Sequence, residues 1–337
     1  MIAMGASIGV IGTGSWGTAL AQVLSDNGCD VLLYGIDPVE IADINENHKN
    51  SKYFGEDPIS DRLRATDRTE ALTDYNDAFV IAVPTRALAA TMESISPYLR
   101  RDTLVINASK GFEAGTGKRI SDYLRDCCPA VTDDNIASII GPSHAEEVIR
   151  RYITSLCAVS RCEETANRVQ QLFANGYFRV YVTSDEAGAE YGVAVKNVIA
   201  IASGILTGLG YGDNAKAALI TRGLREMIKY GTAGGADRET FFGLTGVGDL
   251  IVTCFSPHSR NFRYGCEIGR ADSIEPVRDT ALTVEGVGSC KAVYEHCAAL
   301  GYDVPIIESV YNIIYRGSRP SDELSRIMGR PLKREDL

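Results

Sequence analysis

A single lysine lies in the middle of a long segment of apolar and small residues. The segment runs from Glu190 to Asp213, and Lys196 is the one charged residue between those two acids. Its apolar residues recur three and four positions apart, which predicts a helix buried in the core. A lysine on such a helix is paired, deprotonated or directed at a wet cleft, because burying an isolated charge is costly. The alternative is a lysine that snorkels to the rim of the core, and the segment alone favours that alternative.

A glycine-rich motif near the N-terminus predicts a dinucleotide-binding turn. It follows a strand-like run at 7–11 and precedes a helical pattern at 18–27, the setting that such a motif requires. Its glycines let backbone amides approach a pyrophosphate at the positive end of the helix. We therefore expect NAD(H) or NADP(H) to bind at Gly12, Gly14, Ser15, Trp16 and Gly17.

An acid after the second predicted strand has two interpretations. Asp37 lies 20 residues after Gly17, the spacing expected for an acid that binds the adenosine ribose. Asp37, Pro38 and Glu40 also fit an N-cap, a first-turn proline and a capping-box acid of a helix. We favour capping as the function of Asp37.

Two loops that follow predicted strands carry side chains suited to a site. In a parallel sheet, ligands bind at the carboxyl ends of the strands. Lys110 lies in the loop 107–111, where a cation would face a cofactor or an anionic substrate, although surface lysines are common. His144 lies in the loop 141–145, and we interpret it as a packing or loop residue rather than a catalyst.

Two segments in the second half of the chain add an acid and a cluster of donors. Asp249 lies in an apolar stretch after two glycines, where it either serves the site or caps a helix. Ser259, Arg260 and Asn261 suit a phosphate or carboxylate, unless they form only an exposed polar loop. Together with the two lysines and the dinucleotide motif, these groups predict hydride transfer on a small anionic carbonyl or alcohol.

The elements that must position these residues change character near residue 185. Before it, strand-like runs alternate with helical segments, which predicts a parallel, doubly wound, Rossmann-type α/β sheet. After it, helical periodicity dominates. We therefore predict a dinucleotide-binding domain over 1–185 and an all-α domain over 186–337, with the Lys196 helix along the cleft between them. The predicted strands are 7–11, 30–34, 78–83, 103–106, 136–140, 155–159 and 179–182; the predicted helices include 86–99, 117–127, 163–173, 215–230, 238–255, 285–299, 306–315 and 322–328.

Composition excludes several classes of function. The chain has 337 residues, a formal net charge of −10 and a pI of about 5.0, so we expect no nucleic-acid or anionic-membrane partner. Nine scattered cysteines without a CxxC pair predict reduced thiols in a cytoplasmic protein. Only four histidines are present, so we expect no metal site. The glycines interrupt the apolar N-terminus, and we expect neither a signal peptide nor a membrane span.

Six stretches closely resemble the NAD(P)-dependent sn-glycerol-3-phosphate dehydrogenases of the bacterial type. They span nearly the whole chain in the family's order. The resemblance implies a homodimer that interconverts dihydroxyacetone phosphate and sn-glycerol 3-phosphate and so feeds phospholipid synthesis. The stretches are GTGSWGTALA (12–21), NASKGFE (107–113), GPSHAEE (141–147), VKNVIAIASG (195–204), GVGDLIVTC (246–254) and SRNFRYG (259–265).

The resemblance also implies a role for each matching residue. Lys196 would be the proton donor and acceptor, and Lys110 would contact both cofactor and substrate. Arg260 would bind the substrate and also reach the cofactor. The other substrate-binding residues would be Gly141, Ser143, Asp249, Ser259 and Asn261, and the cofactor would also lie near Ser15, Trp16, Ala145 and Glu285.

The sequence departs from the family pattern at two positions. Ile36 stands where the family usually has a basic residue near the adenosine 2′ position, which leaves the choice between NADH and NADPH open. Thr283 stands where an aliphatic residue is more usual, a milder change.

Two other functions are compatible with a nucleotide half joined to a helical half. One is a related dehydrogenase of 3-hydroxy acids or a ketopantoate-type reductase, which often has a Lys–Asn pair. The other is a nucleotide sensor that binds NAD(H) without turnover. The Ser259–Asn261 cluster favours an enzyme with a phosphorylated substrate over a hydroxy-acid dehydrogenase or ketopantoate-type reductase. A nucleotide sensor would have no use for a proton-transfer lysine.

Overall fold

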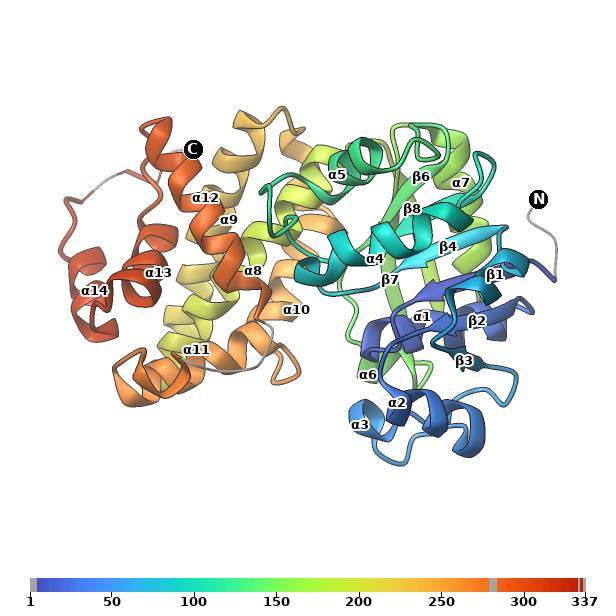
Figure 1. The fold of residues 1–337 in the computed structure, drawn as a ribbon. Coiled ribbons are helices and arrows are strands. Elements are labelled where there is room, and N and C mark those ends of the chain that lie inside the picture. Colours follow the sequence, from blue (N-terminus) through green and yellow to red (C-terminus); the bar gives the residue numbers. More distant parts are fainter. Residues whose placement is uncertain (1–4, 279–283, 333, 336–337) are drawn as a thin grey trace.

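The first half of the chain forms one eight-stranded sheet with helices on both faces (Figure 1). The computed structural model describes residues 5–278, 284–332 and 334–335. The strand order is β3-β2-β1-β4-β5-β6-β7-β8, so the chain winds outward in both directions from β1 and β4. The strands are β1 (Ser7–Ile11), β2 (Asp30–Tyr34), β3 (Arg64–Thr66), β4 (Ala78–Ile81), β5 (Leu104–Asn107), β6 (Ile136–Ile140), β7 (Thr154–Val159) and β8 (Phe178–Thr183).

The sheet is mostly parallel, which confirms the predicted α/β class with one correction. β7 runs antiparallel to β6, with Ile139 opposite Ala158. The connection between them holds only the short helix α6 (Ala145–Val148), whereas a parallel crossover usually needs a longer helix. The next connection contains α7 (Glu163–Phe173), and β8 therefore pairs with β7 in parallel. The prediction missed β3, because a three-residue strand has no apolar run to reveal it.

Helices cover both faces of the sheet with buried apolar side chains. Leu20 of α1 and Val169 of α7 pack on one face, and Leu88 of α4 and Leu124 of α5 pack on the other. α1 begins at Ser15 and not near residue 18 as predicted, because Gly14 occupies the N-cap position. The remaining bounds are α1 (Ser15–Asp26), α2 (Pro38–Ala42), α3 (Ser51–Phe54), α4 (Leu88–Ile95) and α5 (Ile120–Cys127).

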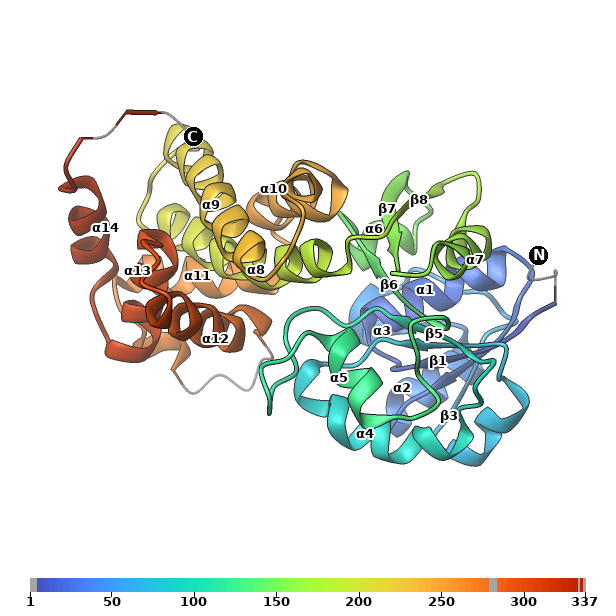
Figure 2. The ribbon, with the colours of Figure 1, turned by 90° about the horizontal axis from the view of Figure 1, so that it is seen from above.

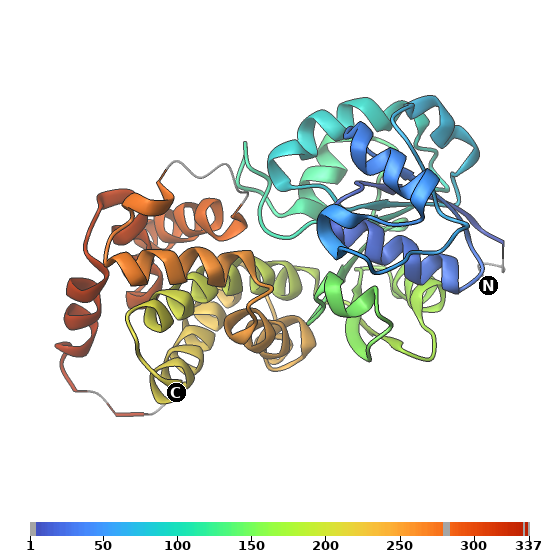
Figure 3. The same ribbon diagram turned by 90° about the horizontal axis from the view of Figure 1, so that it is seen from below.

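The second half of the chain is helical and is built around one central helix. α8 (Glu186–Gly208) starts at the junction with the sheet, where the Asp185 side chain accepts a hydrogen bond from the backbone N of Gly188. Figures 2 and 3 show α8 surrounded by the other helices beside the sheet. These are α9 (Asp213–Ala233), α10 (Asp249–Phe255), α11 (Arg260–Ala271), α12 (Glu285–Ala299), α13 (Pro305–Arg316) and α14 (Pro320–Met328).

Glycines allow α8 and α11 to lie in backbone contact. A Cβ atom at Gly204 would lie 2.1 Å from the carbonyl oxygen of Phe262, and one at Gly265 would lie 2.1 Å from that of Ile201. Gly208 and Gly269, one turn further along, meet the partner backbone in the same way. The contact brings the start of α11 beside the middle of α8.

The helix predicted over 86–99 is α4 flanked by two 3-10 turns, Thr85–Ala87 and Ser96–Tyr98. In the second half of the chain, two segments also differ from prediction. The helix predicted over 238–255 is three elements: a 3-10 helix (Arg238–Phe242), a π-helical turn (Leu244–Gly248) and α10. Gly246 sits so close to Phe241 that a Cβ atom would lie 2.2 Å from its carbonyl oxygen, and no straight helix permits that approach. α11 was not predicted as a helix, because its sequence is strongly polar.

α8 is long and apolar enough to cross a membrane, and among the described residues no other helix meets that test. Of its most apolar stretch, 83% is buried inside the protein. Such burial is typical of a core helix.

Candidate active site

Lys196 forms a buried ion pair with an acid from a different helix. Its Nζ lies 2.5 Å from Asp249 Oδ2, and it donates a hydrogen bond of 3.1 Å to Thr253 Oγ1. Lys196 is 2% exposed and Asp249 is 1% exposed. The snorkelling interpretation of Lys196 is therefore wrong. Asp249 begins α10, but its carboxylate faces the lysine and makes no cap.

Thr253 orients this pair and was not predicted. Its hydroxyl donates to the backbone O of Asp249 at 2.6 Å while it accepts from Lys196. Because the two residues lie four positions apart on α10, they share one face of the helix. That spacing was the available sequence signal.

Lys110 reaches the same site from the sheet half. Burial, and then the positive charge of Lys196, lower its pKa to about 8, against the opposing effect of Asp249 and Glu285. Its ammonium lies 5.2 Å from the centre of the Trp16 ring, within cation–π range. Two cations from the two halves therefore share one site, as an anionic ligand requires.

The start of α11 supplies the predicted donor cluster. Ser259 is the N-cap and accepts from the backbone N of Phe262 at 3.2 Å. Asn261 is buried, and its Oδ1 accepts from the backbone N of Gly286 at 2.9 Å. Arg260 is about half exposed and pairs with Glu285. A residue predicted to bind the substrate is therefore in contact with one predicted to lie near the cofactor. The cluster is structured, and the exposed-loop interpretation is wrong.

The glycine motif forms a tight cradle that fits a dinucleotide. Gly12 has a φ of +120°, and a Cβ atom there would lie 2.6 Å from the carbonyl oxygen of Ala82. A Cβ atom at Gly17 would lie 2.0 Å from Gly12 O, so the turn tolerates no side chain at either position. The Nε1 of Trp16 is buried without a hydrogen-bond partner. Together with the Lys110 cation, these features suit a pyrophosphate-containing cofactor.

The predicted capping function of Asp37 is confirmed. Its carboxylate accepts from the backbone N of Val39 at 3.0 Å and also pairs with Lys52 at 3.0 Å. Glu40 makes no capping box: it accepts from Thr13 Oγ1 at 2.5 Å and from Lys52 at 2.6 Å. Glu40 thus ties the glycine motif to α2, which the sequence prediction missed. Ile36 is 86% exposed beside these groups.

The loop after β6 borders the site from the sheet side. At Gly141 a Cβ atom would lie 2.6 Å from that of Leu156, and the Ser143 hydroxyl donates to Gly141 O at 3.0 Å. Ala145 is buried at the start of α6. His144 has its pKa lowered by burial and then by Lys110, and its ring lies 5.6 Å from that of His258.

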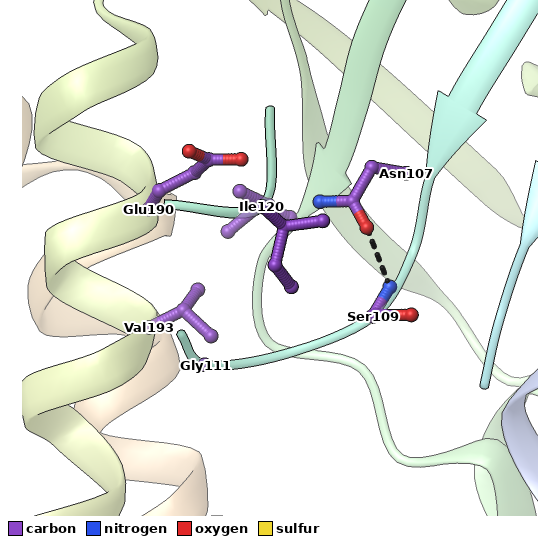
Figure 4. A pocket seen from close by; sticks show the side chains of 7 residues that line it. Asn107, Ser109, Gly111, Ile120, Glu190 and Val193 are labelled. Atoms are coloured by element: carbon purple, nitrogen blue, oxygen red, sulfur yellow. Dashed lines mark hydrogen bonds between the residues drawn. The ribbon is translucent and has the colours of Figure 1, made fainter. Parts of the chain in front are cut away.

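A small cavity lies between the Lys110 loop and α8 (Figure 4). Asn107, Ser109 and Gly111 line it from the loop, and Glu190 and Val193 line it from α8. Its volume is about 10 Å³, close to what one water needs on the same measure.

Among the described residues, no three His, Cys, Asp or Glu side chains are placed to hold a metal ion. Thr283 lies outside the described residues.

Comparisons with known proteins agree over nearly the whole chain. Residues 7–166 and 185–325 match the N- and C-terminal family models of NAD-dependent glycerol-3-phosphate dehydrogenase. The glycerol-3-phosphate dehydrogenase (NAD(P)+) of Latilactobacillus sakei is 44% identical over 337 residues, covering 98% of this chain and 99% of that protein. The protein of the same name from Lactococcus lactis is 42% identical over 330 residues, covering 98% and 97%. The crystal structure of glycerol-3-phosphate dehydrogenase from Coxiella burnetii has a TM-score of 0.88 at 29% identity, covering 97% and 100%.

Proposed function

The chain belongs to the NAD-dependent glycerol-3-phosphate dehydrogenase family, and we propose which of its residues carry out each part of the reaction. The enzyme is an NAD(P)-dependent oxidoreductase that interconverts dihydroxyacetone phosphate and sn-glycerol 3-phosphate. Full-length matches in both halves support this activity over a hydroxy-acid dehydrogenase or a sensor.

Lys196 is the general acid and base. The bound nicotinamide cofactor supplies or accepts the hydride, and the substrate oxygen must then gain or lose a proton. Lys196 Nζ, fixed between Asp249 and Thr253, donates that proton during reduction and accepts it during oxidation. The buried Lys196–Asp249 pair is the observation that carries this proposal.

The remaining charged groups hold the substrate phosphate and the cofactor. Lys110 faces Lys196 and Trp16, so it can contact both ligands. Arg260 presents a planar fork of donors suited to a phosphate. We assign Gly141, Ser143, Asp249, Ser259 and Asn261 to the substrate with these two cations, and Gly12, Gly14, Ser15, Trp16, Gly17, Ala145 and Glu285 to the cofactor.

At the level of the whole chain, the sheet domain ends at residue 185 and the helical domain begins with α8. A homodimer in the cytoplasm that supplies glycerol 3-phosphate for phospholipid synthesis follows from the family. Light scattering on the purified protein tests the dimer: a single species of monomer mass would contradict it.

Lys196→Met tests the catalytic role. General acid–base catalysis contributes roughly 10²–10⁴-fold, so kcat for NADH oxidation with dihydroxyacetone phosphate should fall by at least that order. NADH binding, followed by the fluorescence of Trp16, should survive. A variant that binds NADH normally and keeps most of its kcat would refute the role.

The same substitution leaves Asp249 buried without its partner, and removing one member of a buried pair typically costs about 3–5 kcal/mol. The double variant Lys196→Met/Asp249→Asn should recover much of that stability and none of the activity. The comparison separates loss of the proton from loss of the fold.

A further inference from the structure

Two acids in the first turns of α8 are buried at the junction of the two halves. Arg125 binds Glu186 through two hydrogen bonds of 2.9 and 2.6 Å. Glu190, one turn later, has weaker charge compensation, since the nearest cation, Arg119, lies 3.8 Å away. Burial, and then the charge of Glu186, raise the pKa of Glu190 to about 7. Charge pairing with an arginine therefore compensates Glu186 closely and Glu190 only in part.

Hydroxyl and amide groups of the sheet half surround the Glu190 carboxylate. The Ser121 hydroxyl lies 2.8 Å from its Oε2 and 2.8 Å from Glu186 Oε1, so the two acids share its one hydrogen. The Ser121 backbone N donates to Glu190 Oε1 at 3.2 Å. On the other side, the Ser138 hydroxyl donates to Oε1 at 3.2 Å. Glu190 therefore fixes the orientation of Ser138, a residue of the buried strand β6.

From Ser138 the hydrogen bonds continue into the Lys110 loop. Asn107 Nδ2 donates to Ser138 Oγ at 3.1 Å, and Asn107 Oδ1 accepts from the backbone N of Ser109 at 3.0 Å. The Ser109 hydroxyl then donates to Val83 O at 2.7 Å. Ser109 immediately precedes Lys110. Figure 4 shows Glu190 on α8 facing Asn107 and Ser109 across the cavity.

This chain of hydrogen bonds links the two elements that carry the site lysines. Glu190 lies six positions before Lys196 on the same rigid helix, and Asn107 and Ser109 form the base of the Lys110 loop. The two lysines repel each other, since Lys196 lowers the pKa of Lys110. Gly111, with a φ of +117°, leaves the far side of the loop conformationally permissive. The framework must therefore impose the position of Lys110.

We propose that Glu190 is a positioning residue, which acts through Ser138 and Asn107 to hold the Lys110 loop in register with Lys196. The proposal rests on the assignment of Lys110 and Lys196 to the site. Buried hydrogen bonds of this kind are directional and costly to leave unmade, so each link fixes the next. Loss of one link lets the loop move, and a misplacement of about 1 Å can cost on the order of 10²-fold in rate.

Ser138→Ala is the main test, because it removes the middle link and little volume. We expect kcat/KM for dihydroxyacetone phosphate to fall by about ten-fold or more. Because the buried Asn107 amide loses its acceptor, the melting midpoint should also fall, and kcat/KM is therefore compared well below that midpoint. Glu190→Leu should cause a similar or larger fall. Glu190→Gln keeps an acceptor for Ser138 and should restore kcat/KM to within about three-fold of wild type, a rescue that a mere need for buried charge would not give.

Glu226 provides a matched control. It is also buried on a helix, its pKa is also raised to about 7, and it accepts from the backbone N atoms of Ile306 and Ile307 of α13, outside the hydrogen bonds that join Glu190 to the Lys110 loop. Glu226→Leu should lower the denaturant midpoint about as much as Glu190→Leu, while kcat/KM measured well below the midpoint stays unchanged.

Two results would overturn the positioning role. One is a Ser138→Ala enzyme that retains kcat/KM within two-fold of wild type. The other is an equal loss of kcat/KM in Glu190→Gln and Glu190→Leu. If Lys196→Met is inactive, either result would reject the positioning role of Glu190 and leave the catalytic role of Lys196 intact. An active Lys196→Met would instead reject the proposed site itself.

Discussion

At the scale of the residue, the choice between NADH and NADPH depends on the surface beside α2. Ile36 is exposed there, where a 2′-phosphate would need a cation. Lys52 is one candidate cation on this surface, but it is already held by Asp37 and Glu40, at 3.0 and 2.6 Å. These two carboxylates would repel a phosphate. The local charges therefore favour NADH.

We predict that the wild-type enzyme uses NADH at least as well as NADPH, and that Ile36→Arg improves NADPH selectively, mainly through KM. A hydrogen bond to a charged group contributes roughly 1.5–3 kcal/mol. The measurement is kcat/KM for both cofactors, with Ile36→Gln as a control that adds length without charge. A strong NADPH preference in the wild type would contradict the prediction and point to Lys52.

A second residue-scale prediction concerns Arg260. Lysine keeps the charge but loses the planar fork, which can contact Glu285 with one nitrogen and a phosphate with the others. Arg260→Lys should therefore lower kcat/KM for dihydroxyacetone phosphate, and much less that for unphosphorylated dihydroxyacetone. Parallel assays with the two substrates provide the check. Equal losses for both would assign Arg260 to the cofactor or the fold.

At the scale of the element, the glycine contact between α8 and α11 positions the donor cluster. Gly204 and Gly265 replace side-chain packing with backbone contact, and Gly286 of α12 likewise approaches Asn197 O. The start of α11 therefore lies within reach of Lys196. Any side chain at the crossing would push α11, and Arg260 with it, away from α8.

Gly204→Ala should destabilise the protein by about 1–3 kcal/mol, the usual cost of overpacking, and also lower kcat/KM. Gly288→Ala on α12 is the matched control, because nothing lies within 4 Å of a Cβ atom there. Alanine is a better helix former than glycine, so this control should be neutral or slightly stabilising. The measurement is the denaturant midpoint of both variants. A Gly204→Ala protein as stable as wild type would contradict the prediction and show that α8 and α11 can move apart without cost.

Sequence patterns predicted some elements well and others poorly, for physical reasons. α7 and α12 begin and end where their periodicity does. α11 escaped prediction because its buried face is short: it joins Tyr264 and Ile268 to Gly265 and Gly269, which contact α8 through the backbone, and polar residues dominate the rest of the helix. The direction of β7 depends on the path of the preceding connection, and apolar runs do not encode direction.

In the candidate site, too, some residues could be predicted from the sequence and others could not. Lys196, Lys110 and Asp249 were predicted from unusual residues in recognisable segments. Thr253 and Glu190 were missed because their importance depends on which helices meet. The spacing of Asp249 and Thr253 places them on one face of a helix, but nothing in the sequence shows that Lys196 meets that face or that Glu190 meets Ser138.

At the scale of the whole molecule, two buried glutamates make stability depend on pH. For Glu226, burial raises the pKa to about 7 against the hydrogen bonds from Ile306 and Ile307. An unfolded glutamate has a pKa of about 4.3. Between about pH 4.3 and about pH 7, Glu226 is protonated in the folded protein and ionised in the unfolded protein. The protonated carboxyl therefore stabilises the folded state fully below the unfolded pKa, and this stabilisation is lost as pH rises through the folded pKa.

Glu226→Gln removes this titration. Relative to wild type, the variant should gain on the order of 2 kcal/mol of unfolding free energy between pH 5 and pH 8. Denaturant titrations of both proteins at the two pH values give the difference directly. A difference that does not change with pH would mean that Glu226 stays ionised in the folded protein.

α8 leaves almost no side of itself free: Glu190 faces the sheet half, Lys196 faces the site and Gly204 faces α11. A helix turns by about 100° per residue. One residue inserted or deleted between Glu190 and Lys196 would therefore rotate the lysine away from Asp249 while the glutamate stayed in place. The number of residues along α8 is as much a part of the site as their identity, and length changes in this chain belong on peripheral helices such as α14.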